Sequence, residues 1–288
     1  MFRRYRLEEQ GLSKTLKQDV PTDRYFSIKQ EIETQEKLII NGLEEAYVHG
    51  FGYDADSLQK NWFPVVKGAH TFISHSHKDK ELATNLAIWL KYHFNIDAFI
   101  DSHIWGYALD LQKNIDEKHC KNEDGATYSY EKRNFSTSHV HLMLASSLTR
   151  MLDECECLIF LETSNSILDV DEHSDLTETS ITASPWLMHE LSTSGMLREN
   201  PKIQREEPSL ETFDESFADM ILEKASSEEF NAFYKLDLES ISPIVSADLT
   251  EWSSCCQEEG FKALTQLYNI KGDKLVNVGK KTVRGFNS

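Results

Sequence analysis

The stretch that decides the fold is residues 70–94, which read HTFISHSHKDKELATNLAIWLKYHF. The first five residues, HTFIS, predict a short buried strand. The residues from 82 onward predict a helix, because large apolar side chains recur every fourth position at Leu82, Leu86, Leu90 and Phe94. A strand that leads into a helix in this way is typical of α/β proteins.

The same alternation continues along the chain. Residues 97–101 (DAFID) predict a second short strand, and residues 144–152 predict another amphipathic helix. Residues 157–163 (CLIFLET) form the most hydrophobic strand, which is expected at the centre of a sheet. Ser184 and Pro185 predict the start of a helix, as N-cap and first helical residue. We therefore expect a parallel sheet covered by helices on both faces.

The rest of the chain is assigned by composition and pattern. The main domain is expected over residues 68–270, with a strand at 233–238 and a closing helix at 259–268. An N-terminal helical extension, 1–62, is expected to be peripheral, and a basic tail occupies 271–288. Polar composition predicts three insertions, near 107–140, 164–183 and 199–230.

Charge and cysteine content narrow the class of protein. The 288 residues include 30 Lys and Arg against 48 Asp and Glu, for a net charge of −18. This balance argues against nucleic acid and anionic membranes as partners. The five cysteines form no CxxC pair, and no apolar run approaches the ~20 residues of a membrane helix. We expect a soluble cytoplasmic protein.

Polar and aromatic residues follow three of the predicted strands. They are Ser74 to His77 after the first, Asp101 to Gly106 after the second, and Ser164 to Ser166 after the third. Ligands of parallel sheets bind at the carboxyl ends of the strands. We therefore expect these three segments to become neighbours at one edge of the sheet.

Three segments, in order, resemble the Toll/interleukin-1 receptor (TIR) domain family in its bacterial branch. FISHSHKD at 72–79 is similar to the family's first box, and FID with Trp105-Gly106 is similar to its second strand and BB loop. SPWLMHEL at 184–191 resembles the box that carries the family's catalytic glutamate. The sequence departs from the family pattern at His75, where Tyr is frequent, and in the long segments before the glutamate.

The resemblance implies a flavodoxin-like parallel sheet and cleavage of the nicotinamide–ribose bond of NAD, by hydrolysis or cyclisation, in an anti-phage or stress effector. NAD would be the substrate, with no further cofactor and no metal, and other TIR domains would be partners in a homo-oligomer. Glu190 would be the catalytic residue. The residues expected to contact NAD are His75, Ser76, Lys78, Phe99, Asp101, Trp105 and Trp186.

The expected reaction requires few catalytic groups. The nicotinamide of NAD carries a positive charge and leaves as a neutral molecule, so no acid is needed to protonate it. One carboxylate can stabilise the oxocarbenium-like ribose. Glu190 lies four residues after Trp186, which puts both on one helix face. Spacing alone favours a core Trp186 and an exposed Glu190, and it is the family resemblance that reverses this.

Two further hypotheses remain open from the residues. His75, His77 and Asp79 match part of the HxHxD zinc motif of metallohydrolases, although Lys80 stands where that motif has His. The alternative is a strand-end loop with surface histidines. A non-enzymatic TIR module, which only docks other TIR domains, would have no need of Glu190.

Local charge predicts how a pyrophosphate would be held. Residues 151–197 contain ten Asp and Glu and no Lys or Arg. The phosphates of NAD would therefore need Lys78, Lys80, backbone N–H groups or a second protomer. Trp105, next to a glycine in a predicted loop, is the candidate for an aromatic contact with that protomer.

Overall fold

A five-stranded parallel sheet organises the molecule in the computed structural model, which describes residues 1–9, 12–37, 43–49, 52–100, 102–168, 180–199 and 232–273. The strands lie in the order β5-β4-β6-β1-β9, and every neighbouring pair is parallel. They are β1 (Arg3–Glu8), β4 (Thr71–Ser74), β5 (Ala98–Ile100), β6 (Cys157–Glu162) and β9 (Ser242–Ile244). The fold is α/β and flavodoxin-like, as predicted.

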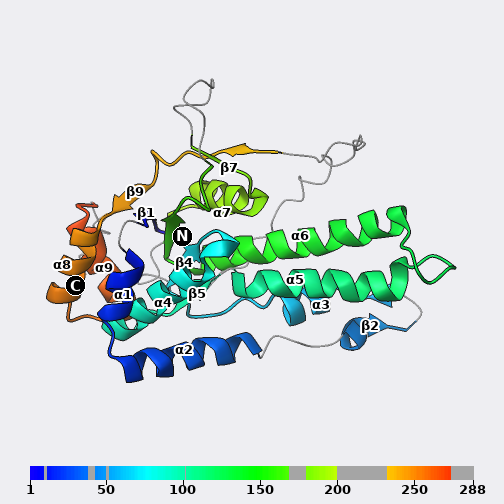
Figure 1. The fold of residues 1–288 in the computed structure, drawn as a ribbon, viewed down its shortest axis with the longest axis horizontal. Coiled ribbons are helices and arrows are strands. Elements are labelled where there is room, and N and C mark those ends of the chain that lie inside the picture. Colours follow the sequence, from blue (N-terminus) through cyan, green and yellow to red (C-terminus); the bar gives the residue numbers. More distant parts are fainter. Residues whose placement is uncertain are drawn as a thin grey trace, which may run out of the picture.

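Helices cover both faces of this sheet (Figure 1). On one face they are α1 (Leu12–Gln18), α2 (Thr22–Lys37), α4 (Lys80–Phe94), α8 (Ser246–Cys255) and α9 (Gly260–Ile270). On the other face they are α3 (Ala55–Trp62), α5 (Ser102–Ile115), α6 (Tyr130–Glu154) and α7 (Pro185–Met196). Each face has its own apolar core.

The remaining elements are short and peripheral to the main sheet. Two antiparallel pairs are formed by β2 (Tyr47–Val48) with β3 (Gly52–Tyr53), and by β7 (Ile181–Thr182) with β8 (Tyr234–Lys235). The described part of the chain also contains two short 3₁₀ helices, η1 (Leu43–Ala46) and η2 (His77–Asp79), and one π-helical turn, η3 (Asp116–Cys120). The predicted strand at 233–238 thus exists as β8, outside the main sheet.

The central strand and the first helix form as their sequences predict. β6 lies in the middle of the sheet and its first five residues are buried, because neighbouring strands and helices cover both of its faces. Successive residues of β4 serve opposite cores: Phe72 packs on the α5–α6 side and Ile73 on the α4 side. The four apolar residues of α4 at i, i+4 spacing are all buried.

The prediction of a peripheral helical extension over residues 1–62 is wrong at its beginning. Residues 3–8 form β1, which lies inside the sheet between β6 and β9. Tyr5 and Leu7 alternate with Arg4 and Arg6, so one side of the strand enters the core while these two arginines lie on the other. Residues 12–37 are helical, and α1 and α2 pack against α4.

The prediction of an irregular insertion at 107–140 is also wrong. Apart from a turn over 121–129, the segment belongs to α5, η3 and α6, and Figure 1 shows α5 and α6 running side by side away from the sheet. Its polar composition reflects the outward faces of the two helices, while Leu111, Val140 and Leu144 are buried between them and the sheet. Most of the other predicted insertions, and residues 274–288 of the tail, lie outside the described residues.

Candidate functional site

A buried carboxylate lies where β4 ends against α7. Glu190 is fully buried, and Ser74 Oγ donates a hydrogen bond of 2.6 Å to Glu190 Oε2. Ser74 is the last residue of β4 and is itself fully buried. The contact joins two segments 116 residues apart in the chain, so Glu190 lies at the carboxyl edge of the sheet, where parallel sheets bind their ligands.

The start of α7 is set by its own sequence. Ser184 is the N-cap, with its hydroxyl accepting a hydrogen bond from the backbone N–H of Leu187 at 3.3 Å, and Pro185 is the first helical residue. This confirms the helix start predicted from residues 184 and 185. It fixes the phase of α7, so that Leu187, Glu190 and Leu191 all turn inward.

A cavity of about 420 Å³, within the size range of small-molecule sites, is lined by residues near this pair in the chain: His75 follows Ser74, and Leu187 precedes Glu190 by three residues on α7. Its walls come from the loop after β4 and from α5, α6 and α7. The lining residues are His75, His77, Ser102, Ala108, Leu109, Gln112, Val140, His141, Leu144, Ser184, Trp186 and Leu187. Glu190 is not among them, but His75, which follows Ser74 in the chain, is.

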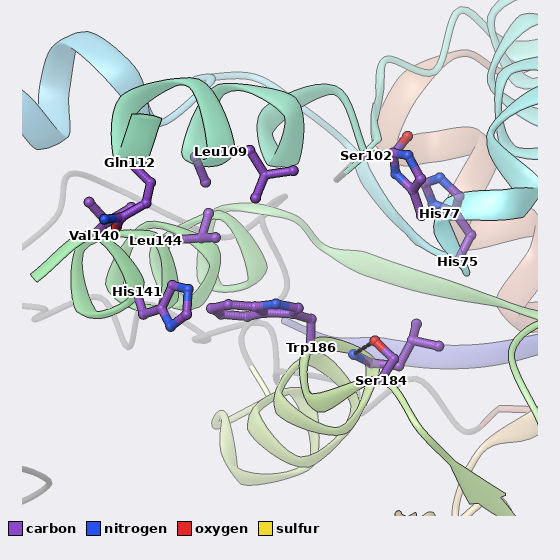
Figure 2. A pocket seen from close by; sticks show the side chains of 12 residues that line it. His75, His77, Ser102, Leu109, Gln112, Val140, His141, Leu144, Ser184 and Trp186 are labelled. Carbon is purple, nitrogen blue, oxygen red and sulfur yellow. Dashed lines mark hydrogen bonds between the residues drawn. The ribbon is translucent and has the colours of Figure 1, made fainter. Parts of the chain in front are cut away.

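The side chains divide this cavity into a middle and two ends (Figure 2). In the middle, the Trp186 indole lies across from Leu109 and Leu144. We call the end with His75, His77 and Ser102 the near end, and the end with Gln112, Val140 and His141 the far end. The near end includes His75, which directly follows Ser74 in the chain. The cavity can therefore hold a flat apolar group on Trp186 with polar groups at both of its ends.

Two of the predicted strand ends meet through Asp79. This carboxylate is largely buried and accepts hydrogen bonds from Thr163 Oγ1 at 2.6 Å and Asn165 Nδ2 at 2.7 Å. The loops after β4 and β6 are thus tied together, which confirms that their polar residues are neighbours. Asp79 is occupied in this tie, so its role here is structural.

Three of the residues predicted to contact NAD belong to the cavity or its immediate surroundings. His75 and Trp186 line the cavity, and Ser76 is the half-buried residue between two lining histidines. His75 is 3 % exposed, and its Nδ1 lies 3.2 Å from the carbonyl oxygen of Ile73.

The other predicted contacts lie elsewhere or outside the described residues. Lys78 is exposed and is not part of the lining. Phe99 is a core residue that packs on Phe72, with ring centroids 5.2 Å apart. Asp101 is outside the described residues, as is the side chain of Trp105. The backbone of Trp105 belongs to α5, so the prediction that it lies in a loop is wrong.

Sequence reasoning missed the contribution of α5 and α6. Leu109, Gln112, Val140, His141 and Leu144 all line the cavity. The first three were expected to lie in an irregular segment, and Leu144 in a helix that was given no role in the site. The spacing of apolar residues could have indicated this contribution, because Val140 and Leu144 are four residues apart and so share one face of a helix. His141 stands edge-on to Trp186, with ring centroids 5.6 Å apart and an interplanar angle of 89°.

One titratable residue of the cavity lining, His141, has a pKa that its surroundings shift. Partial burial lowers the pKa of His141, and burial likewise lowers the pKa of His189, which packs near Trp186. Among the described residues that line the cavity there is no Lys or Arg. Within the described ranges, no three His, Cys, Asp or Glu side chains are grouped so that they could hold a metal ion.

In comparisons with known proteins, the chain matches no family model, no curated protein and no solved structure. In the part of the chain that the structure describes, no helix is both long enough and apolar enough to cross a membrane. What the site can do must therefore be argued from its own geometry.

Proposed function

We propose that this protein is a TIR-type enzyme that cleaves the nicotinamide–ribose bond of NAD, by hydrolysis or cyclisation. The observation that carries the proposal is the buried Glu190–Ser74 pair at the carboxyl edge of the sheet, close in the chain to residues that line a cavity floored by Trp186. This is the position that the TIR resemblance assigns to a catalytic glutamate. We also propose a cytoplasmic location, since all five cysteines are free thiols.

The reaction requires one main contribution from the protein, which is to stabilise developing charge. Nicotinamide leaves NAD as a neutral molecule, and the positive charge that develops on the ribose must be stabilised. Glu190 supplies a negative charge in a water-poor environment, where electrostatic interactions are strong. Ser74 holds one carboxylate oxygen in place. Attack by water would give ADP-ribose, and attack by the adenine ring would give a cyclic product.

The placement of the substrate follows from the shape of the cavity. The nicotinamide ring would stack on Trp186, and the ribose would lie toward the near end, next to His75. Because none of the described lining residues is a Lys or Arg, the pyrophosphate would lie outside the cavity, with Lys78, Lys80 or a second protomer as the source of positive charge. Asp101 and Trp105 remain predicted contacts.

The test is Glu190→Gln, which keeps the shape of the side chain and its ability to accept the Ser74 hydrogen bond. NAD turnover, followed by chromatography of the products, should fall by about 10²–10³ while the thermal midpoint stays near wild type. The matched control is Glu156→Gln. Glu156 is also buried but lies at the opposite edge of the sheet, where it accepts from Tyr268 at 3.2 Å. Turnover within threefold of wild type in Glu190→Gln would remove Glu190 from the mechanism.

A second candidate function is a non-enzymatic TIR module that docks other TIR domains. It is favoured by the finding that Glu190 is 0 % exposed and is not part of the cavity lining, as expected of a structural carboxylate. Wild-type protein that forms no product from NAD, at concentrations where it self-associates, would support this candidate. Turnover that is lost with EDTA and restored by zinc would instead indicate the metallohydrolase.

A further inference from the structure

The outward face of α6 carries two large apolar side chains. Phe135 is 70 % exposed and Leu142 is 65 % exposed, whereas Val140, Leu144 and Leu148 bury the opposite face of the helix in the core. Phe135 and Leu142 are seven positions apart, which places them on one face about 10 Å from each other. Exposed apolar residues are ordinary when they are scattered singly, but these two form a short stripe. We call Phe135 and Leu142 the α6 stripe.

The α6 stripe lies where another helix can reach it. α7 packs on a different face of α6, through the contacts of His141 with Trp186 and of Thr149 with His189. Figure 1 shows the first half of α6 extending past α7, on the arm that it forms with α5 and away from the sheet. A second helix could therefore lie along the stripe without meeting the sheet.

The charges of α6 are distributed unevenly along this face. Glu131 is in the first turn of the helix, and residues 132–152 include Lys132, Arg133 and Arg150 but no Asp or Glu. Glu131 and Arg150 are both exposed, and within the described ranges neither forms an ion pair on its own molecule. The stripe thus has an unpaired negative charge beyond one end and an unpaired positive charge beyond the other.

This face is complementary to itself when two α6 helices run antiparallel. With a two-fold axis midway between residues 135 and 142, Phe135 lies opposite Leu142 of the partner subunit, and the converse contact forms at the same time. Helical side chains lean toward the N-terminus of their helix. Glu131 and Arg150 of the partner subunit therefore lean toward each other. A parallel pair would instead bring like charges together.

We propose that the outer face of α6 is a docking surface for a second copy of this chain, which pairs antiparallel through the α6 stripe with a Glu131–Arg150 ion pair beyond each end. Two crossing helices share a small contact area, so the dimer is reversible, with a dissociation constant in the micromolar range. The inference does not rest on the proposed reaction, because the residues of α6 that line the cavity lie on its other faces.

Sedimentation velocity of the full chain, from about 1 µM to about 500 µM at low salt and neutral pH, tests this surface. We expect a monomer–dimer equilibrium. Phe135→Ser and Leu142→Ser should each raise the dissociation constant at least about tenfold, because each substitution occurs twice in a two-fold dimer. The matched control is Phe26→Ser. Phe26 is 62 % exposed on α2, and this variant should associate like the wild-type protein.

A charge exchange tests the orientation of the two helices. Glu131→Arg and Arg150→Glu should each raise the dissociation constant about three- to tenfold at low salt, because each replaces two ion pairs by like charges. The double variant restores opposite charges and should return to within about threefold of wild type. Glu131→Arg also puts a positive charge in the first turn of α6, which weakens the helix. The double variant keeps that cost, so its recovery can come only from a contact between chains.

Three results would overturn the inference. Wild-type protein that stays monomeric at every concentration would mean that something other than a second copy covers the stripe. Dimerisation unchanged by Phe135→Ser would place the contact elsewhere, and a double charge variant as weak as the single ones would reject the antiparallel pairing. The reaction is judged separately, by NAD turnover. A stripe-dependent dimer without turnover would support this surface and reject the proposed function, and Glu190-dependent turnover in a strict monomer would do the reverse.

Discussion

At the scale of single residues, the contact between Ser74 and Glu190 is the one on which the site depends. Both side chains are fully buried, and the bond between them is 2.6 Å long. A buried carboxylate that loses a donor keeps its desolvation penalty without the compensating bond. Ser74 therefore contributes to stability as well as to the position of Glu190.

We expect Ser74→Ala to lower the free energy of unfolding by about 2 kcal/mol, the cost of removing a hydrogen bond to a buried carboxylate. Urea denaturation at neutral pH measures this loss. Ser76→Ala is the control, because the Ser76 hydroxyl makes no capping hydrogen bond at η2 and its side chain is only half-buried. A change in Ser74→Ala no larger than in the control would show that the bond contributes nothing to folding.

At the scale of elements, His70 joins the start of β4 to the start of β5. Its Nδ1 accepts a hydrogen bond of 3.1 Å from the Asp97 backbone N–H, and Phe261 of α9 packs on its ring with centroids 4.4 Å apart. Gly260, at φ +56°, lies so close to His70 Nε2 that an added Cβ would be 2.9 Å from it. Protonation of Nδ1 would remove the acceptor on which this junction depends.

Stability should therefore fall as the solution becomes acidic. Burial lowers the pKa of His70, and Lys91 lowers it further, against the opposing effect of Asp97. Because the unfolded chain then binds the proton more tightly, this contribution is complete above about pH 6.5 and is lost as the pH falls through the folded-state value. Burial also lowers the pKa values of His93, His141 and His189. Their contributions to stability therefore change with pH in the same direction as that of His70.

The His70→Asn variant isolates one of these groups. Asn keeps an acceptor near the position of Nδ1 but does not titrate. The decline in unfolding free energy between mildly alkaline and mildly acidic pH should be smaller in the variant than in wild type. Superimposable pH profiles for the two proteins would mean that His70 does not contribute to the decline.

At the scale of the whole molecule, the N-terminal strand completes the sheet. In five-stranded flavodoxin-like sheets of order 2-1-3-4-5, the fourth position is filled by the strand that follows the third in the chain. Here β1 fills it, and the chain after β6 passes through α7 and returns as β9 at the edge. The sheet therefore cannot be completed without the first residues of the chain.

Deletion of residues 1–8 should abolish cooperative folding. It would remove a strand bonded on both sides, to β6 and β9, and take Tyr5 and Leu7 out of the core. Circular dichroism during thermal unfolding would show the loss of a cooperative transition. Glu8→Ala is the control, since Glu8 is exposed at the end of β1. This variant should unfold like the wild-type protein. A shortened chain with a normal transition would contradict the assignment of β1 as an interior strand.

The sequence by itself determined the elements whose signals are local. The i, i+4 pattern of α4, the apolar run of β6 and the Ser184-Pro185 start of α7 each specify a structure through neighbouring residues, and all three are present. Glu190 and Trp186 could be assigned to one face of α7 because the helical repeat relates positions four apart.

Only the tertiary structure decided what meets over long distances in the chain. Arginines alternating with Tyr5 and Leu7 are compatible with an edge, an interior strand or no sheet at all, and the pairing with β6 across more than 150 residues selects one. The cavity likewise depends on how α5 and α6 pack against α7, which places Gln112 and His141 beside Trp186. Such contacts depend on side chains from distant segments fitting together, and neither the period nor the composition of a single segment contains that information.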